Sequence, residues 1–426
     1  MAPYTSELAR ALAPGLLERF ERYVRIDTQA VRERSRSPSS PGQLVLGRVL
    51  VSDLQAAGLN DAALDDDGYV TATLAATGAD APVIGLIAHM DTSPDAPGVG
   101  VQPIVHRDYD GEAIALPRGD TRLDPVTMPE LAGKHGHDIV TSSGDTLLGA
   151  DDKAGVAEIV TAVAHLAAHP ELPRPTLRVA FTPDEEIGLG PSRFDIEAFG
   201  ASCAYTIDGS EIGEIQDESF SAIEVRIAVR GVDVHPGTAN GKLVNALRVL
   251  AAIVAALPPD RLSPETTSGR QGFIHPHLLQ GDAGRAELQV ILRDFDEDLL
   301  EAHVALLRSV TDEAVIAHPG ARADFDVRTQ YRNMKAFIAP EPQIVAAAEA
   351  ALRAEGIEPV RTAIRGGTDG SQLSEMGLPT PNLFTGGHEY HSVREWASVN
   401  DMAAAAATIV RLAGVWAQNG NGAGRA

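Results

Sequence analysis

The sequence predicts an α/β fold: a catalytic domain with a mixed, mostly parallel sheet and helices on both faces, plus an inserted α+β lid domain. Three observations predict this fold. Short apolar runs alternate with amphipathic helical segments in the first half of the chain. Near residue 218 the pattern changes to strands that alternate apolar and polar residues. At 426 residues the chain is also too long for one ordinary core, so two domains are expected.

The elements of the first domain follow in order. Leucines and Phe20 at helical spacing predict an amphipathic helix over 6–24, and a second helix is expected after the polar loop 32–43, ending at Gly58. Apolar runs at 82–89, 176–183 and 203–208 fit buried strands, and 154–169 between the first two fits a helix. Strand, helix and strand in this order predict right-handed crossovers, with sites beyond the carboxyl ends of the strands.

The inserted domain is expected at 218–330, so that 1–217 and 331–426 form a discontinuous catalytic domain. Its predicted order is strand, helix, strand, helix, strand, at the ranges 220–237, 240–257, 286–296, 296–315 and 323–331. This order indicates a small, independent α+β layer. After the chain returns to the catalytic domain at 331, a further helix is expected at 341–356, and a segment rich in glycine and turn residues follows it.

Charge and composition exclude several classes of protein. The formal charge of −24 opposes binding to nucleic acid or to an anionic membrane surface. The single cysteine, Cys203, excludes an intramolecular disulfide and a cysteine-based zinc site. We read neither a signal peptide nor an apolar run long enough to span a membrane, so we expect a cytoplasmic protein.

Five acidic or histidine residues, each just beyond an apolar run, carry the functional prediction: His89, Asp151, Glu186, Asp208 and His391. Singly each is weak evidence, because Asp151 is also suited to cap a helix and the other side chains are equally typical of solvated loops. Side chains beyond parallel strands converge, however, and this set suits two borderline divalent cations, Zn²⁺ above all. Two such cations hold the water and the carbonyl needed for amide hydrolysis.

Two neighbouring carboxylates complete the predicted chemistry. Asp91 lies two residues after His89 and is placed to accept a hydrogen bond from the second nitrogen of that imidazole. Glu185 precedes Glu186, and adjacent residues of an extended chain point in opposite directions. Glu185 is therefore predicted to activate a water that bridges the metals and to pass its proton to the leaving amine. The alternative for Glu185 is a solvated carboxylate.

The motifs resemble those of the M20 family of zinc peptidases, and within it the peptidase T branch of aminotripeptidases, over about residues 5–415. The blocks that carry the resemblance are HMDTSPD, TLLGADDKAG, FTPDEEIG, YTIDG, VHPGTANG, ILRDFD, IRGGTDGSQLS and PNLFTGGHEYH. The resemblance implies that His89, Asp151 and Asp208 bind one zinc, and that Asp151 bridges to a second zinc bound by Glu186 and His391. It also implies a cis peptide bond between Asp151 and Asp152.

For the lid, the resemblance implies that His235 supports the oxyanion and that Arg293 binds the substrate carboxylate. The alternative for His235 is a surface histidine at a strand-to-turn junction. Arg365 is a second candidate for the carboxylate, with a structural ion pair as its alternative. Gly366 and Gly367 would let the backbone approach a ligand closely, or form a turn.

The sequence departs from the branch in one stretch: SVREW follows His391, where members usually carry a second histidine. His275 and His277 suggest a third metal, but loop histidines or substrate contacts are the favoured interpretation.

We therefore expect a two-zinc aminopeptidase that releases the N-terminal residue of short peptides, tripeptides above all. Co²⁺ or Mn²⁺ would suit the same ligands. The alternatives are a dipeptidase or N-acyl amino acid amidohydrolase of the same superfamily, and a catalytically silent metal- or peptide-binding protein. An exposed lid strand leaves open a homodimer.

Overall fold

The computed structural model describes residues 4–34, 36–78 and 81–420. It divides into two compact units. The larger unit comprises Met1–Asp217, Ala336–Thr362 and Thr368–Ala426, and the smaller unit comprises Glu218–Lys335 and Ala363–Gly367. Residues 331–335 thus cluster with the smaller unit, although the sequence placed them in the catalytic domain. One cause is Asn333, whose side chain and backbone bond to Ser219, Ser221 and Phe295.

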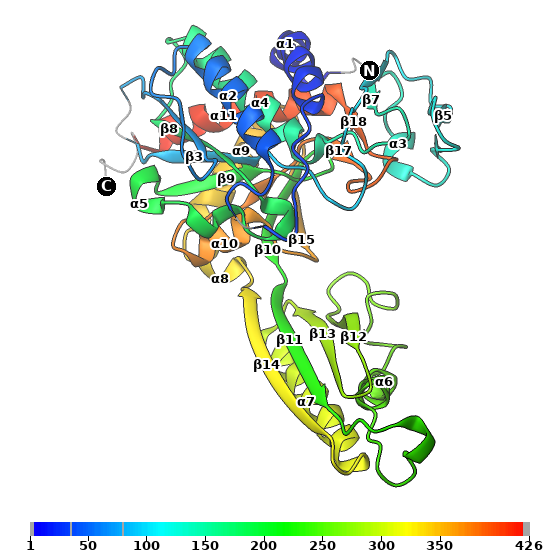
Figure 1. Ribbon diagram of the computed structural model, residues 1–426. Helices are drawn as coiled ribbons and strands as arrows, with labels where there is room; N and C mark the ends of the chain where they lie inside the picture. The colour runs from blue at the N-terminus through cyan, green and yellow to red at the C-terminus, as the bar shows by residue number, and fades with distance from the viewer. Residues whose placement is uncertain (1–3, 35, 79–80, 421–426) are drawn as a thin grey trace. The chain divides into compact units, whose positions relative to one another are not determined.

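The larger unit is built on an eight-stranded mixed sheet (Figure 1). Its order is β1 (Ala63–Leu64), β2 (Val70–Leu74), β8 (Leu177–Thr182), β3 (Ile84–His89), β9 (Cys203–Ile207), β16 (Asn382–Leu383), β10 (Glu214–Ser219), β15 (Val360–Ile364). Strands β8, β3, β9 and β16 are parallel, whereas β2 and β10 pair antiparallel with their neighbours. All residues of β3 and β9 are buried, which explains their apolar sequence.

Helices cover both faces of this sheet, and the predicted fold class is confirmed (Figure 1). Helix α4 (Ala150–Ala168) packs on β3 and β9, beneath α1 (Glu7–Val24) and α11 (Val399–Gly420). Helix α2 (Pro41–Ala56) packs on β2, and α9 (Pro342–Ala354) packs on α11. Helix α10 (Asp369–Glu375) lies against β9 and contributes Leu373 to a cluster on the other face. No helix within the described ranges is long and apolar enough to cross a membrane.

A second sheet in the larger unit was not predicted. Its order is β17 (Gly387–His388), β18 (Trp396–Ser398), β7 (Ile139–Thr141), β4 (Ile104–His106). Between β4 and β7 lie β5 (Ile114–Ala115), β6 (Arg122–Leu123) and α3 (Pro129–Ala132), packed around Trp396. Strands of two or three residues are too short to show an alternating pattern, so the sequence gives no signal for them.

The smaller unit is an antiparallel sheet with two helices on one face (Figure 1). The strand order is β12 (Phe273–Gly281), β13 (Arg285–Asp294), β11 (Ser221–Arg230), β14 (Arg322–Tyr331). Helices α6 (Ala246–Ala256) and α7 (Glu297–Ala317) cover the apolar face, and α8 (Lys335–Ile338) follows β14 in the chain. Strand β12 was not predicted, and its His275 and His277 therefore lie in a strand and not in a loop.

Candidate metal centre and active site

The candidate site lies at the carboxyl edge of the parallel strands. His89 is the last residue of β3, and Asp208 directly follows β9. Glu185 and Glu186 lie in a short 3-10 turn, η1 (Glu185–Ile187), just beyond β8. Because β8, β3 and β9 are adjacent and parallel, their ends deliver these side chains to one place.

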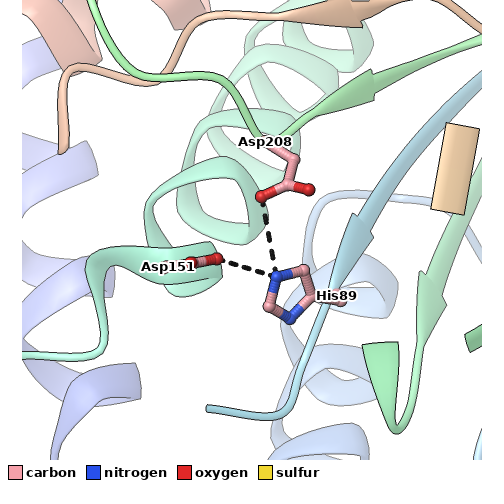
Figure 2. A group of neighbouring side chains, drawn as sticks. All are labelled: His89, Asp151 and Asp208. Atoms are coloured by element: carbon pink, nitrogen blue, oxygen red, sulfur yellow. Dashed lines mark hydrogen bonds and ion pairs between the residues drawn. The ribbon is translucent and has the colours of Figure 1, made fainter. Parts of the chain in front are cut away.

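One group of potential ligands consists of His89, Asp151 and Asp208 (Figure 2). The Nε2 atom of His89 lies 2.8 Å from Oδ1 of Asp151 and 3.6 Å from Oδ1 of Asp208. The other ring nitrogen, Nδ1, lies on the far side of the ring, 3.1 Å from the main-chain oxygen of Asp91. The imidazole therefore presents one nitrogen to the two carboxylates and anchors the other on the backbone.

A second group consists of Asp151, Glu186 and His391. The Nε2 atom of His391 lies 2.8 Å from Oε2 of Glu186 and 3.2 Å from Oδ2 of Asp151. Asp151 belongs to both groups, and each of its oxygens faces a different histidine. In each group the ligand atoms all lie within 4.8 Å of one another. The five residues thus form a candidate metal site in which one carboxylate is placed to bridge two cations.

The electrostatics of the cluster fit divalent cations. Burial raises the pKa of Asp208 to about 6 and that of Glu186 to about 8. Hydrogen bonds to Asp151 and Glu186 raise the pKa of His391 to about 11. The buried Oε1 atom of Glu186 has no hydrogen-bond partner among the residues described. Burial therefore favours the protonated form of Glu186 in the bare protein, whereas at Asp151 burial is outweighed by hydrogen bonds from His391 and His89, which lower its pKa. Cations at the same ligands would neutralise the carboxylates without protons.

The entrance of α4 places Asp151 against the strand ends. The peptide bond between Asp151 and Asp152 is cis, as the resemblance implied. Asp152 accepts hydrogen bonds from the backbone N–H of His89 at 3.1 Å and of Gly155 at 3.1 Å, which ties the helix to β3. A Cβ atom at Gly155 would lie 1.8 Å from the carbonyl oxygen of Ile207, so only glycine allows this approach.

Asp91 and Glu185 lie in the same cluster. The Asp91 carboxylate accepts the backbone N–H groups of Glu185 at 3.0 Å and Glu186 at 3.1 Å, and Oδ1 lies 3.4 Å from Nδ1 of His89. Asp91 therefore holds the turn that carries both glutamates, a task that the sequence did not suggest. Burial, with added repulsion from Asp369 and Asp208 against attraction from His89, raises the pKa of Glu185 well above its ordinary value.

Comparison with known proteins agrees with this geometry. Residues 146–414 match peptidase family M20/M25/M40. Peptidase T of Bacillus subtilis is 46% identical over 400 residues, which cover 93% of this chain and 97% of that protein. The chain therefore belongs to the M20 peptidase family, in its peptidase T branch. It is a metallopeptidase, a hydrolase of peptide bonds, as the sequence predicted.

Solved structures give the same assignment of the fold. The aminopeptidase PepT from Bacillus cereus superposes with a TM-score of 0.73 at 25% identity, covering 95% of this chain and 99% of that one. A tripeptidase from Staphylococcus aureus superposes with a TM-score of 0.76 at 21% identity, with the same coverage. Both likenesses extend over the sheet, its helices and the antiparallel layer of the smaller unit.

The remaining predicted residues belong to the smaller unit. His235 is exposed at the start of η3 (Pro236–Thr238), where its Nδ1 accepts the N–H of Gly237. Arg293 lies on β13 and donates to the carbonyl oxygen of Arg365 at 3.2 Å, and its buried Nε has no partner among the described residues. The Arg365 guanidinium donates to main-chain oxygens of residues 267, 269 and 271. These contacts are hydrogen bonds to main-chain oxygens and not the ion pair that was the alternative for Arg365.

Several buried carboxylates around the site were missed by sequence reasoning. Asp184 accepts hydrogen bonds from the backbone N–H of Ser39 and the Gln43 side chain, which ties the loop before α2 to the turn before Glu185. Asp369 accepts a hydrogen bond from Thr182 at 2.6 Å, and burial raises its pKa to about 7. Glu395 is the third buried carboxylate near the site. Each lies in or beside a motif that the sequence singled out, yet nothing in a single sequence separates a buried carboxylate from a solvated one.

Proposed function

We propose that this chain is an aminopeptidase that uses two zinc ions to release the N-terminal residue of short peptides, tripeptides above all. One observation carries the proposal: Asp151 presents one oxygen to each of two histidines, in two ligand groups that share it. The peptidase T relatives, and the tripeptidase of the same fold, support the substrate class. A cytoplasmic location belongs to the same proposal.

In this proposal His89, Asp151 and Asp208 would hold the first cation, and Asp151, Glu186 and His391 would hold the second. Two divalent cations supply Lewis-acid polarisation of the scissile carbonyl and lower the pKa of water. Zn²⁺ suits the two imidazoles and three carboxylates best, and Co²⁺ or Mn²⁺ fit the same set.

Glu185 moves the protons of the reaction. Its carboxyl group has a raised pKa, which suits a group that first takes a proton from the attacking water and then gives it to the departing amine. The Asp91 carboxylate fixes the backbone of Glu185 and Glu186 together, so the base and the neighbouring ligand keep a constant separation. Asp91 thus acts through Glu185 and His89, and does not itself touch the substrate.

The smaller unit recognises the rest of the peptide and acts as a lid. His235 is exposed, which suits it to support the oxyanion. Arg293 keeps a donor, Nε, that no described residue uses, which suits it to bind the terminal carboxylate of the substrate. Arg365 holds the segment 267–271 beside Arg293 and so shapes the carboxylate site indirectly.

The test measures release of the N-terminal residue from a matched di-, tri- and tetrapeptide series by the zinc-loaded protein. Glu185→Gln keeps the side-chain volume and removes the base, and Glu197→Gln makes the same change of charge at an exposed position. We expect fastest cleavage of the tripeptide, a loss of at least about a hundredfold in Glu185→Gln with bound zinc unchanged, and no loss in Glu197→Gln. Equal rates for all three lengths would remove the tripeptide preference. Cleavage of acylated amino acids but of no peptide would replace the aminopeptidase by an amidohydrolase.

A further inference from the structure

The loop between β17 and β18 carries two side chains that reach the metal site in different ways. His391 is a candidate ligand, and its side chain is 42% exposed. Glu395, four residues later, is only 1% exposed and is not among the candidate ligands. The hydrogen bonds of the Glu395 carboxylate indicate its role.

Both oxygens of Glu395 accept hydrogen bonds from the backbone at the entrance of α4. Oε2 accepts the N–H groups of Leu148 and Gly149, each at 2.7 Å. Oε1 accepts the N–H of Asp151 at 3.0 Å. Hydrogen bonds from N–H groups to a carboxylate are among the stronger ones in proteins. Glu395 therefore binds the backbone of the segment that carries the shared ligand.

The start of α4 has no side-chain cap within its own helix. Gly149 stands at the N-cap position of α4 with φ of 81°, and no side chain of the helix caps it. Asp151 itself has non-helical backbone angles, with φ −83° and ψ 104°. The first N–H groups of a helix need acceptors. Here Glu395 accepts the N–H of Asp151 in the first turn, together with the N–H groups of the two residues just before the helix.

We propose that Glu395 is a positioning residue that holds Asp151 in its bridging orientation and so sets the affinity for the second cation. Because Glu395 and His391 share one loop, the same contact fixes the loop that supplies His391 against the segment that supplies Asp151. The proposal rests on the proposed function, since it needs two cations to bind. It differs from a merely structural cap, which would lower stability without changing the affinity for metal.

The experiment compares Glu395→Gln with Glu355→Gln in the full chain. Glu355 is also 1% exposed, and it accepts hydrogen bonds from Thr5 on the segment before α1 and from Arg411 on α11. In Glu395→Gln the amide keeps one acceptor oxygen but turns an NH₂ group toward a backbone N–H. The metal-free proteins are titrated with Zn²⁺ against a chelator of known affinity, and their melting temperatures are recorded.

In Glu395→Gln we expect the affinity for the more weakly bound of the two zinc ions to fall about 10–100-fold. In Glu355→Gln we expect the affinities for both zinc ions to stay unchanged. Wild-type affinity for both equivalents in folded Glu395→Gln, with only a lower melting temperature, would overturn the proposal. If Glu395→Gln does not fold, Glu395→Asp is measured instead. It keeps the charge but shortens the reach, and unchanged affinity there would also overturn the proposal. A wild type that binds fewer than two equivalents would refute the proposed function itself, independently of Glu395.

Discussion

The two candidate cation positions share Asp151 but are built differently. His89 and Asp208, at the first position, stand at the ends of adjacent parallel strands, and their side chains are 2% and 11% exposed. Glu186 and His391, at the second, stand in a 3-10 turn and a loop, and His391 is 42% exposed. The ladder of backbone hydrogen bonds fixes the first pair. The second pair depends on single carboxylates that hold its turns, namely Asp91 and Glu395.

The loop of the second position also stores backbone strain. Glu389 and His391 have φ values of 56° and 59°, in the left-handed region that side chains disfavour. Such residues cost about 1–2 kcal/mol each, and they persist where surrounding contacts fix them. The sheet therefore places the strand-end ligands, with Asp91 and Asp152 hydrogen-bonded to His89, whereas the loop ligands need other residues to hold their backbone. We expect the first position to bind its cation more tightly.

The largest effect is expected from His89→Ala. It removes the histidine of the buried position, whose side chain is only 2% exposed. We expect kcat/KM for a tripeptide to fall by more than about a thousandfold, since several kcal/mol of transition-state stabilisation depend on that cation. Zinc content measured after gel filtration should fall by one equivalent. A variant that keeps both equivalents would show that the strand-end position does not need its histidine.

His391→Ala should cost less and should respond to added ligand. We expect a loss of about a hundredfold, because Asp151 and Glu186 remain at the second position. Free imidazole can reach this exposed place, so added imidazole should raise the activity about tenfold. The buried position offers no such access, and imidazole should leave His89→Ala unchanged. Equal rescue of both variants, or of neither, would break the comparison.

A smaller effect is expected from Asp95→Asn. Oδ2 of Asp95 lies 3.6 Å from Nδ1 of His391, while Oδ1 pairs with Arg32. A carboxylate behind a ligating histidine raises its basicity, but here both side chains are half exposed. We expect about a tenfold loss of affinity at the second position. The exposed pair Arg118–Asp145 provides a control, and Asp145→Asn should leave metal affinity unchanged.

The difference between strand-end ligands and loop ligands also explains which site residues the sequence could predict. Ligands at strand ends could be predicted, because apolar runs predict buried strands and the topology brings the carboxyl ends of these strands together. His89 and Asp208 are the examples. His391 was assigned to the second zinc only through the resemblance, since the strands beside it, Gly387–His388 and Trp396–Ser398, are too short to leave a pattern. Glu395 was not identified, because its partners are backbone groups far away in the sequence.

The smallest effect on activity is expected from Glu158→Gln. This substitution isolates the free-energy cost of burying a carboxylate. Glu158 lies on α4, the helix that carries Asp151, but both its buried oxygens lack a hydrogen-bond partner among the described residues. Burial, with repulsion from Asp401, raises its pKa well above the ordinary value. Asp401 is itself paired with Lys134, and Asp152 is the other carboxyl group near Glu158.

The sign of the pH dependence follows from this raised pKa. Below about pH 4.5 Glu158 is protonated in both states and costs nothing. As the pH rises, the unfolded chain releases the proton while the folded protein keeps it, so the free energy of unfolding falls by about 1.4 kcal/mol per pH unit until the folded pKa is reached. Glu158→Gln should therefore melt at a higher temperature than the wild type at pH 7.5, and the difference should vanish near pH 4.5. A difference that stays constant across this range would mean that burial at this position does not oppose the charge.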